Sequence, residues 1–375
     1  MTDSDPRPTD LLRLRDAVEP YPAEPSDEQL AEELGLPPEQ VVRFDMNTLG
    51  GGPLPAVVEA LRTYDPARLV EYGDQAYRRL RAAIEGATGS PAHRVIPGAG
   101  ADELIRLLTT MSAGPGDSVV IPTPTFAMFA VEARLAGAGV VEVARDDPGE
   151  RQSVERIREA AERAAARLVW LCSPNNPTGD WYSADEIAVL ADGLPALVVV
   201  DTVYQEMAEV SLGLPPEGAS LLHLQNRFEN LLIVRSLAKA YGLAGARVGY
   251  LVVPEGLAAR FEASRLPLAI GGASEAAAIA ALSDAAAARA RLTEIVAQRQ
   301  RLASALEGLG WRVLPSLANF LLVRPPDAHA IANALLRQGL AVRSYPSGPL
   351  RDWLRITVRA PAENDRLLEA LGSAG

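Results

Sequence analysis

The sequence predicts an α/β fold, in which a three-layer α/β/α large domain with a mostly parallel sheet is joined to a smaller α+β domain. Three observations lead to this prediction. From about residue 53, helical patterns alternate with short runs that are rich in valine and leucine. These runs are apolar at successive residues, which is typical of strands that helices cover on both faces. Finally, 375 residues exceed the size of one simple core, so two domains are expected.

The elements can be placed in chain order. Residues 1–45 are rich in proline and glutamate and hold one short helical stretch, SDEQLAEELG, which Ser26 opens as an N-cap. Helical patterns then alternate with the predicted strands of the large domain, which are 118–122, 139–145, 167–172, 196–201, 230–236 and 247–253.

The pattern changes after an alanine-rich stretch at 273–292, which is predicted to be a helix between the domains. Strands predicted at 319–324, 340–343 and 354–358 then alternate with two helices. We therefore predict a large domain over 47–270, and a second unit in which the N-terminal arm 1–46 joins the small domain 271–375.

Composition excludes several classes of function. The net charge of −12 argues against nucleic acid or an anionic membrane as a partner. The single cysteine, Cys172, precludes an internal disulfide and fits a reducing compartment such as the cytoplasm. The three histidines lie far apart in the sequence, so no metal site is expected. The N-terminus lacks the apolar segment of a signal peptide, and no apolar run reaches the length of a membrane span.

Lys239 is the only lysine in the chain, although lysine and arginine together number 36. A guanidinium stays charged in proteins, whereas the surroundings of an ammonium can turn it into a neutral nucleophile. A surface cation can be either residue, so a lone lysine in an arginine-rich chain indicates a position where the amine must lose its proton. The alternative is a leftover solvated lysine, and the neighbouring residues decide between the two.

The carboxyl ends of three predicted parallel strands lie at one edge of the sheet and bring polar side chains together there. Ligands bind at this edge in open α/β sheets. One strand runs into SPNNPTG at 173–179, the next ends at Asp201, and the third runs toward Lys239. A lysine amine condenses with a carbonyl group, and the commonest biological carbonyl of this kind is pyridoxal 5′-phosphate (PLP). That cofactor needs an amine, an acid at its ring nitrogen, donors to its phenolic oxygen and an anion site.

The chain offers each of these groups. Lys239 is the amine, Asp201 is placed to pair with the ring nitrogen, and Asn176 and Tyr204 are placed to donate to the phenolic oxygen. The glycine turn GAGADE at 98–103 opens a helix whose free N–H groups favour a phosphate. Arg247 and Ser236 complete that anion site. Each of these motifs alone has an ordinary structural explanation as a turn, a cap or a surface charge, so their joint order carries the prediction.

In this order the motifs resemble those of fold-type I PLP enzymes of the class I/II aminotransferase family, most closely the histidinol-phosphate aminotransferase subgroup. The resemblance runs from VEPYPAEPSDEQLAEELGL to LRITV and is most specific at SPNNPTG and at S-L-x-K-A-Y-G-L-A-G-x-R-x-G. It implies a homodimer with shared active sites, a small-molecule amino donor and a 2-oxo acid acceptor.

The resemblance also implies a role for each matching residue. Lys239 matches the lysine that bonds to the cofactor, with Asp201 and Tyr204 as its catalytic partners. Tyr72 matches a tyrosine that reaches the cofactor phosphate of the other subunit, and Phe126 matches an aromatic residue that stacks on the ring. The residues matching the phosphate turn are Gly100, Ala101 and Asp102. The residues matching substrate-side positions are Tyr21, Asn47, Arg343 and Arg355.

The sequence departs from the subgroup at three places near the expected site. The subgroup's Asn-Glu-Asn-Pro is replaced by NTLG at 47–50, so only Asn47 remains. Ala238 stands before the lysine, where a serine or threonine is usual, and removes one hydroxyl from the expected phosphate site. The stretch DTVY at 201–204 replaces DEAY. These changes bear on the substrate more than on the cofactor.

Transamination is therefore the expected reaction. Two alternatives remain open at this stage. The same fold and cofactor also support decarboxylation, elimination or replacement at Cβ or Cγ, and cyclisation. A transcription regulator built on an aminotransferase body would need a basic DNA-binding domain, whereas about 45 acidic, proline-rich residues precede this one.

Overall fold

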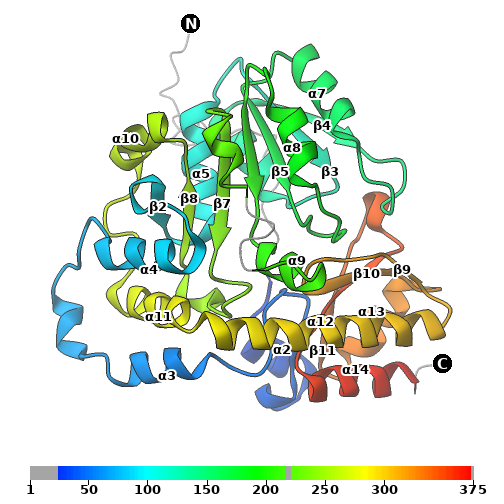
Figure 1. Ribbon diagram of the computed structural model, residues 1–375. Helices are drawn as coiled ribbons and strands as arrows, with labels where there is room; N and C mark the ends of the chain where they lie inside the picture. The colour runs from blue at the N-terminus through cyan, green and yellow to red at the C-terminus, as the bar shows by residue number, and fades with distance from the viewer. Residues whose placement is uncertain (1–23, 216–220, 373–375) are drawn as a thin grey trace, which may run out of the picture.

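Two β-sheets organise the chain in the computed structural model, which describes residues 24–215 and 221–372 (Figure 1). In these residues the larger sheet has seven strands, in the order β2 (Val95–Gly98), β8 (Gly249–Val252), β7 (Leu231–Ser236), β6 (Leu197–Asp201), β5 (Leu168–Cys172), β3 (Ser118–Thr123) and β4 (Gly139–Ala144). Strands β3 to β7 are parallel to one another, whereas β8 runs antiparallel to both β7 and β2.

Helices cover both faces of this sheet and form the predicted three layers. One face packs against α5 (Gly100–Ser112), α6 (Met128–Ala136) and α10 (Glu255–Ser264). The other face packs against α4 (Arg78–Thr88), α7 (Val154–Arg163), α8 (Ala184–Ala191), α9 (Gln205–Ser211) and α11 (Gly272–Ser283), with α3 (Pro55–Arg62) beside α11. The strands are buried because apolar side chains meet a helix layer on either side, and every residue of β5 and β7 is buried. The predicted α/β class is confirmed.

The smaller sheet has five strands in the described residues, in the order β1 (Val42–Phe44), β11 (Leu340–Ser344), β12 (Leu354–Thr357), β10 (Phe320–Arg324) and β9 (Arg312–Val313). It shares a core with α12 (Ala285–Gly308), α13 (Ala328–Leu336) and α14 (Pro361–Gly372). Strand β1 pairs with β11, so the N-terminal segment that begins with α2 (Asp27–Leu34) joins the C-terminal part of the chain. This pairing supports the division at residues 46 and 270, which stays a prediction.

The alanine-rich stretch predicted as one helix forms two helices that meet at Asp284. The Asp284 side chain accepts a hydrogen bond from the backbone N–H of Ala287 at 3.3 Å, which caps the first turn of α12. Helix α12 contacts α9, which packs on the large sheet, and α14, which packs on the small one, and Figure 1 shows it crossing the lower part of the molecule above α14. It therefore ties the two sheets together. No helix of the described residues is long and apolar enough to cross a membrane.

Candidate active site

The site lies where the parallel strands β5, β6 and β7 end side by side. Cys172 at the end of β5 lies opposite Asp201 at the end of β6, and Asp201 lies opposite Val234 in β7. The loops that follow carry Asn176, Tyr204 and Lys239. The structure thus brings to one edge the three groups that sequence analysis placed at strand ends.

Lys239 is half-buried at this edge, and its Nζ lies 3.4 Å from the backbone oxygen of Met46. Burial, together with the positive charges of Arg355 and Arg247, lowers the pKa of the Lys239 amine to about 8. The carboxylates of Asp102 and Asp201 oppose this shift without cancelling it. An ordinary lysine has a pKa of about 10.4, so this amine is far more readily available as a neutral nucleophile.

Asp201 is 3 % exposed and accepts a hydrogen bond from the backbone N–H of Val203 at 3.1 Å. Burial raises the pKa of the Asp201 carboxyl to about 7, and the nearby Asp102 carboxylate acts in the same direction. A buried carboxylate is stabilised mainly by a positive partner. The protonated ring nitrogen of PLP is such a partner, so the chemistry of Asp201 fits its predicted pairing with that nitrogen.

A glycine turn forms a cradle at the start of α5. Gly100 adopts a left-handed conformation with φ of +83°, and a Cβ there would lie 2.7 Å from the Arg247 guanidinium. A Cβ on Gly249 would lie 2.8 Å from the backbone carbon of Gly100, so only glycine lets the two segments approach this closely. The N–H groups of the first turn of α5, which have no acceptor within the helix, thus lie next to the Arg247 guanidinium. This donor set fits the phosphate of PLP.

The residues beside the cradle are partly engaged by one another. Arg247 forms an ion pair with Asp102 at 2.7 Å, and both side chains are about half exposed. The Ser236 hydroxyl accepts a hydrogen bond from the backbone N–H of Ala238 at 3.1 Å. Ala101 lies in the first turn of α5. Phe126 is partly buried and makes an edge-to-face contact with Phe129, with ring centroids 5.8 Å apart.

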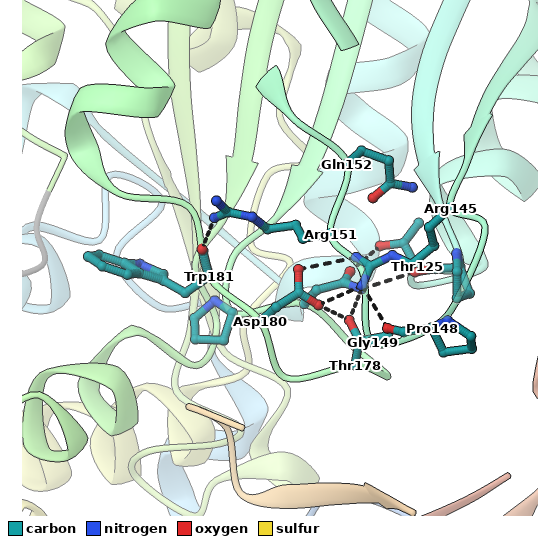
Figure 2. Close-up of polar contacts among 12 residues, drawn as sticks. Thr125, Arg145, Pro148, Gly149, Arg151, Gln152, Thr178, Asp180 and Trp181 are labelled. Atoms are coloured by element: carbon teal, nitrogen blue, oxygen red, sulfur yellow. Dashed lines mark hydrogen bonds and ion pairs between the residues drawn. The ribbon is translucent and has the colours of Figure 1, made fainter. Parts of the chain in front are cut away.

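The loop after β5 is held by a buried ion pair that sequence analysis did not identify (Figure 2). Arg145, whose side chain is 4 % exposed, binds both carboxylate oxygens of Asp180 at 3.0 and 3.1 Å and also the backbone oxygen of Pro148. Asp180 in turn accepts from the Thr178 hydroxyl. Removing Asp180 would leave the Arg145 charge buried without its partner, at a cost of about 3–5 kcal/mol. The only sequence signal was the aspartate that directly follows SPNNPTG.

Arg355 reaches this loop from the smaller sheet. Its Nη1 donates to the side-chain oxygen of Asn176 at 2.6 Å and its Nη2 donates to the backbone oxygen of Asp45, while its buried Nε has no partner in the described residues. Because Asn176 accepts through its oxygen, its amide nitrogen remains a donor for the site. Arg343 forms an ion pair with Glu24, a residue that sequence analysis also missed.

One predicted residue, Tyr72, does not join this group in the single chain. Tyr72 is 90 % exposed on the segment after the short helix Pro66–Val70, so its predicted contact with a second subunit's cofactor stays a prediction. Tyr21 lies outside the described residues.

Asn47 is buried next to Tyr204, and its side-chain nitrogen donates to the tyrosine hydroxyl oxygen at 3.0 Å. The described residues contain no group of three or more histidine, cysteine or acidic side chains that could hold a metal ion.

Comparisons with known proteins agree with this geometry. The sequence model of the family described as aminotransferase class I and II matches residues 39–371. The chain is 38 % identical to the histidinol-phosphate aminotransferase of Roseiflexus castenholzii and 36 % identical to that of Symbiobacterium thermophilum, covering 95 % of this chain in both cases and 95 % and 96 % of the relatives. It is also similar to the crystal structure of histidinol-phosphate aminotransferase from Sinorhizobium meliloti in complex with pyridoxal-5′-phosphate, with a TM-score of 0.84 and 28 % identity over 94 % of this chain and 96 % of that one.

Proposed function

As a member of the class I and II aminotransferase family, this chain is a PLP-dependent aminotransferase, and we propose that it moves the amino group of histidinol phosphate to a 2-oxo acid such as 2-oxoglutarate. When bound, PLP supplies an aldehyde that takes up the amino group and a ring that accepts electrons from the substrate. The names of the relatives support histidinol phosphate as the amino donor, and the arrangement of two arginines supports this choice independently.

Arg343 and Arg355 carry the proposal. They are directly opposite each other on β11 and β12, and directly opposite residues of paired strands project from the same face. Like charges in this position destabilise a sheet unless an anion lies between them. A phosphate monoester supplies two negative charges and several acceptors for such a pair, and the distal carboxylate of a dicarboxylic oxo acid uses the same donors. One anion site can therefore serve donor and acceptor in turn.

The chain's own residues account for the remaining steps. Lys239, once its amine is neutral, accepts the proton from the carbon that bears the donor's amino group. Asp201 holds positive charge at the ring nitrogen, while Asn176 and Tyr204 donate hydrogen bonds to the phenolic oxygen. Arg355 orients the substrate and remains bonded to Asn176, so the substrate and cofactor sites share one hydrogen-bonded chain.

A donor screen in single turnovers tests the substrate. The visible absorbance of the PLP form is followed after adding histidinol phosphate, an aromatic amino acid or glutamate to separate samples. We expect histidinol phosphate and glutamate to convert the cofactor, and Arg343→Ala to slow both. An aromatic amino acid that reacted more than about tenfold faster than histidinol phosphate would overturn the proposed donor.

The lowered pKa of Lys239 predicts how the protein takes up PLP. Below pH 8 the amine carries a proton and cannot attack the aldehyde; above pH 8 it is increasingly neutral. Uptake by protein freed of cofactor should therefore accelerate as pH rises, with a midpoint near 8 rather than near the usual value of about 10.4. Stopped-flow absorbance at a series of pH values checks this, and a rate that kept rising up to pH 10 would contradict the lowered pKa.

Glu24 is expected to compete with the anionic end of the substrate for Arg343. The two side chains form an ion pair and are only 24 % and 26 % exposed. Removing the carboxylate frees Arg343, so Glu24→Gln should lower KM for histidinol phosphate about two- to fivefold with little change in kcat. Steady-state kinetics with Glu32→Gln, an exposed position on α2, serve as the control. An unchanged KM in Glu24→Gln would show that the two anions do not compete.

We further propose a cytoplasmic homodimer. Leu69, Val70 and Tyr72 are 69 %, 81 % and 90 % exposed on one short segment, and a second copy would remove this apolar surface from water. Sedimentation at micromolar concentration should give twice the mass of the chain. Sedimentation as a single chain at that concentration would exclude shared active sites.

A further inference from the structure

Asn47 is held by its neighbours through every polar group that it has. It is 2 % exposed and adopts a left-handed conformation with φ of +53°. Its backbone N–H donates to the Thr357 hydroxyl at 3.0 Å, and its backbone oxygen accepts from the Asn319 amide at 3.1 Å. Its side-chain oxygen accepts from Thr357 at 3.2 Å, and its side-chain nitrogen donates to the Tyr204 hydroxyl oxygen at 3.0 Å. Thr357 and Asn319 are completely buried.

These bonds fix the direction in which each proton points. The Thr357 oxygen accepts from a backbone N–H, so its own proton goes to the Asn47 side-chain oxygen. The Asn47 amide must then turn its nitrogen toward Tyr204, which becomes an acceptor for that nitrogen. The Tyr204 proton consequently remains available to another acceptor. Phe320 holds the tyrosine ring edge-to-face, with centroids 5.3 Å apart.

We propose that Thr357, Asn319 and Asn47 form a positioning network whose role is to keep Tyr204 a hydrogen-bond donor toward the phenolic oxygen of PLP. This inference rests on the proposed function of Tyr204 and goes beyond it, because it assigns Asn47 to support of the tyrosine instead of contact with the substrate. The second N–H of the side-chain amide is the one donor of Asn47 outside this network, because its backbone N–H, both of its oxygens and its other amide N–H are engaged within it.

The network also joins the two sheets. Asn319 directly precedes β10 and Thr357 ends β12, where Phe320 pairs with Thr357, whereas Tyr204 follows β6 of the larger sheet. Burial raises the pKa of the Tyr204 hydroxyl, and the Arg355 charge and the Asn47 hydrogen bond offset part of this rise. The smaller sheet thereby makes the tyrosine a better donor than burial alone would allow.

The test is a pH titration of the visible absorbance of PLP-loaded protein without substrate. If Tyr204 is a weaker hydrogen-bond donor, more negative charge stays on the phenolic oxygen of PLP. That charge raises the pKa of the proton on the nitrogen that joins Lys239 to the cofactor. Thr357→Val and Asn47→Asp should each raise the titration midpoint by about 0.5–1 pH unit, the equivalent of one hydrogen bond. In Asn47→Asp the carboxylate accepts from Tyr204 and draws its proton away from the cofactor.

Three controls separate positioning from general damage. Thr357→Ser keeps the hydroxyl and should restore the original midpoint. Thr109→Val makes the same change at an equally buried threonine whose hydroxyl has no partner among the described residues, and it should leave the midpoint unchanged. In a Tyr204→Phe background, Thr357→Val should add no further shift, because there is no tyrosine proton left to position.

The outcomes distinguish this inference from the function on which it rests. If Tyr204→Phe raises the midpoint while Thr357→Val and Asn47→Asp do not, the network is wrong and the role of Tyr204 stands. If Tyr204→Phe itself causes no shift, both the role of Tyr204 and the network are wrong. Should Asn47→Asp fail to fold by circular dichroism, Thr357→Val, which is nearly isosteric, decides the question.

Discussion

Replacing Lys239 with alanine is expected to lower kcat/KM by about 10⁴-fold or more, because the variant loses both the nucleophile and the general base. The chain has no second lysine to substitute for it. The variant should still bind PLP through the glycine cradle and Arg247, since those groups do not depend on the amine. Single-turnover absorbance with histidinol phosphate measures the rate of cofactor conversion directly.

Lys239→Arg is the matched control for charge. A guanidinium keeps the positive charge at this position but does not become neutral, so this variant should be as inactive as Lys239→Ala. Recovery of substantial activity in Lys239→Arg would show that the residue acts through its charge alone. That result would contradict the interpretation of a lone lysine in an arginine-rich sequence.

Asp201→Asn should have the next largest effect, a fall in kcat of about 10²–10³-fold. The amide has nearly the same shape as the carboxylate but carries no negative charge, so the ring nitrogen loses the partner that keeps it protonated. Because Asp201 is buried, water cannot replace that charge. Rapid-quench measurement of product in one turnover separates this chemical step from product release.

An exposed aspartate provides the comparison for this variant. Asp185 lies in the first turn of α8, and Asp185→Asn should leave the rate unchanged. Asp201→Glu keeps the charge and should recover part of the lost activity. If Asp201→Asn turned over at the normal rate, the carboxylate would have no part in holding charge at the ring.

Much of the site could be predicted because the end of each apolar run marks the end of a strand in the sequence. An apolar run that stops at Asp201, and another that leads within a few residues to Lys239, mark two neighbouring positions at the carboxyl edge of a parallel sheet. The cofactor prediction followed from the chemistry of these residues together with a glycine turn. The family comparisons and the PLP-bound relative agree with that prediction, and they give no support to the alternative PLP chemistries or to a DNA-binding role.

The supporting residues could not be found this way. Thr357 and Asn319 meet Asn47 only because β10 and β12 pair in one register and because Asn47 adopts a positive φ, and neither feature is visible in the sequence. Arg145 and Asp180 lie 35 residues apart and meet across two loops. Strands β1, β2 and β9 were missed because two to four residues give too short a pattern to recognise.

Borohydride reduction of the PLP-loaded protein, followed by peptide mass analysis, tests the central claim most directly. The reagent converts the bond between an amine and the cofactor into a permanent one. We expect a single modified peptide that carries the cofactor on Lys239, and no modification in Lys239→Arg. A colourless protein that gave no adduct at residue 239, or one that gave the adduct only at the N-terminal amine, would contradict the account.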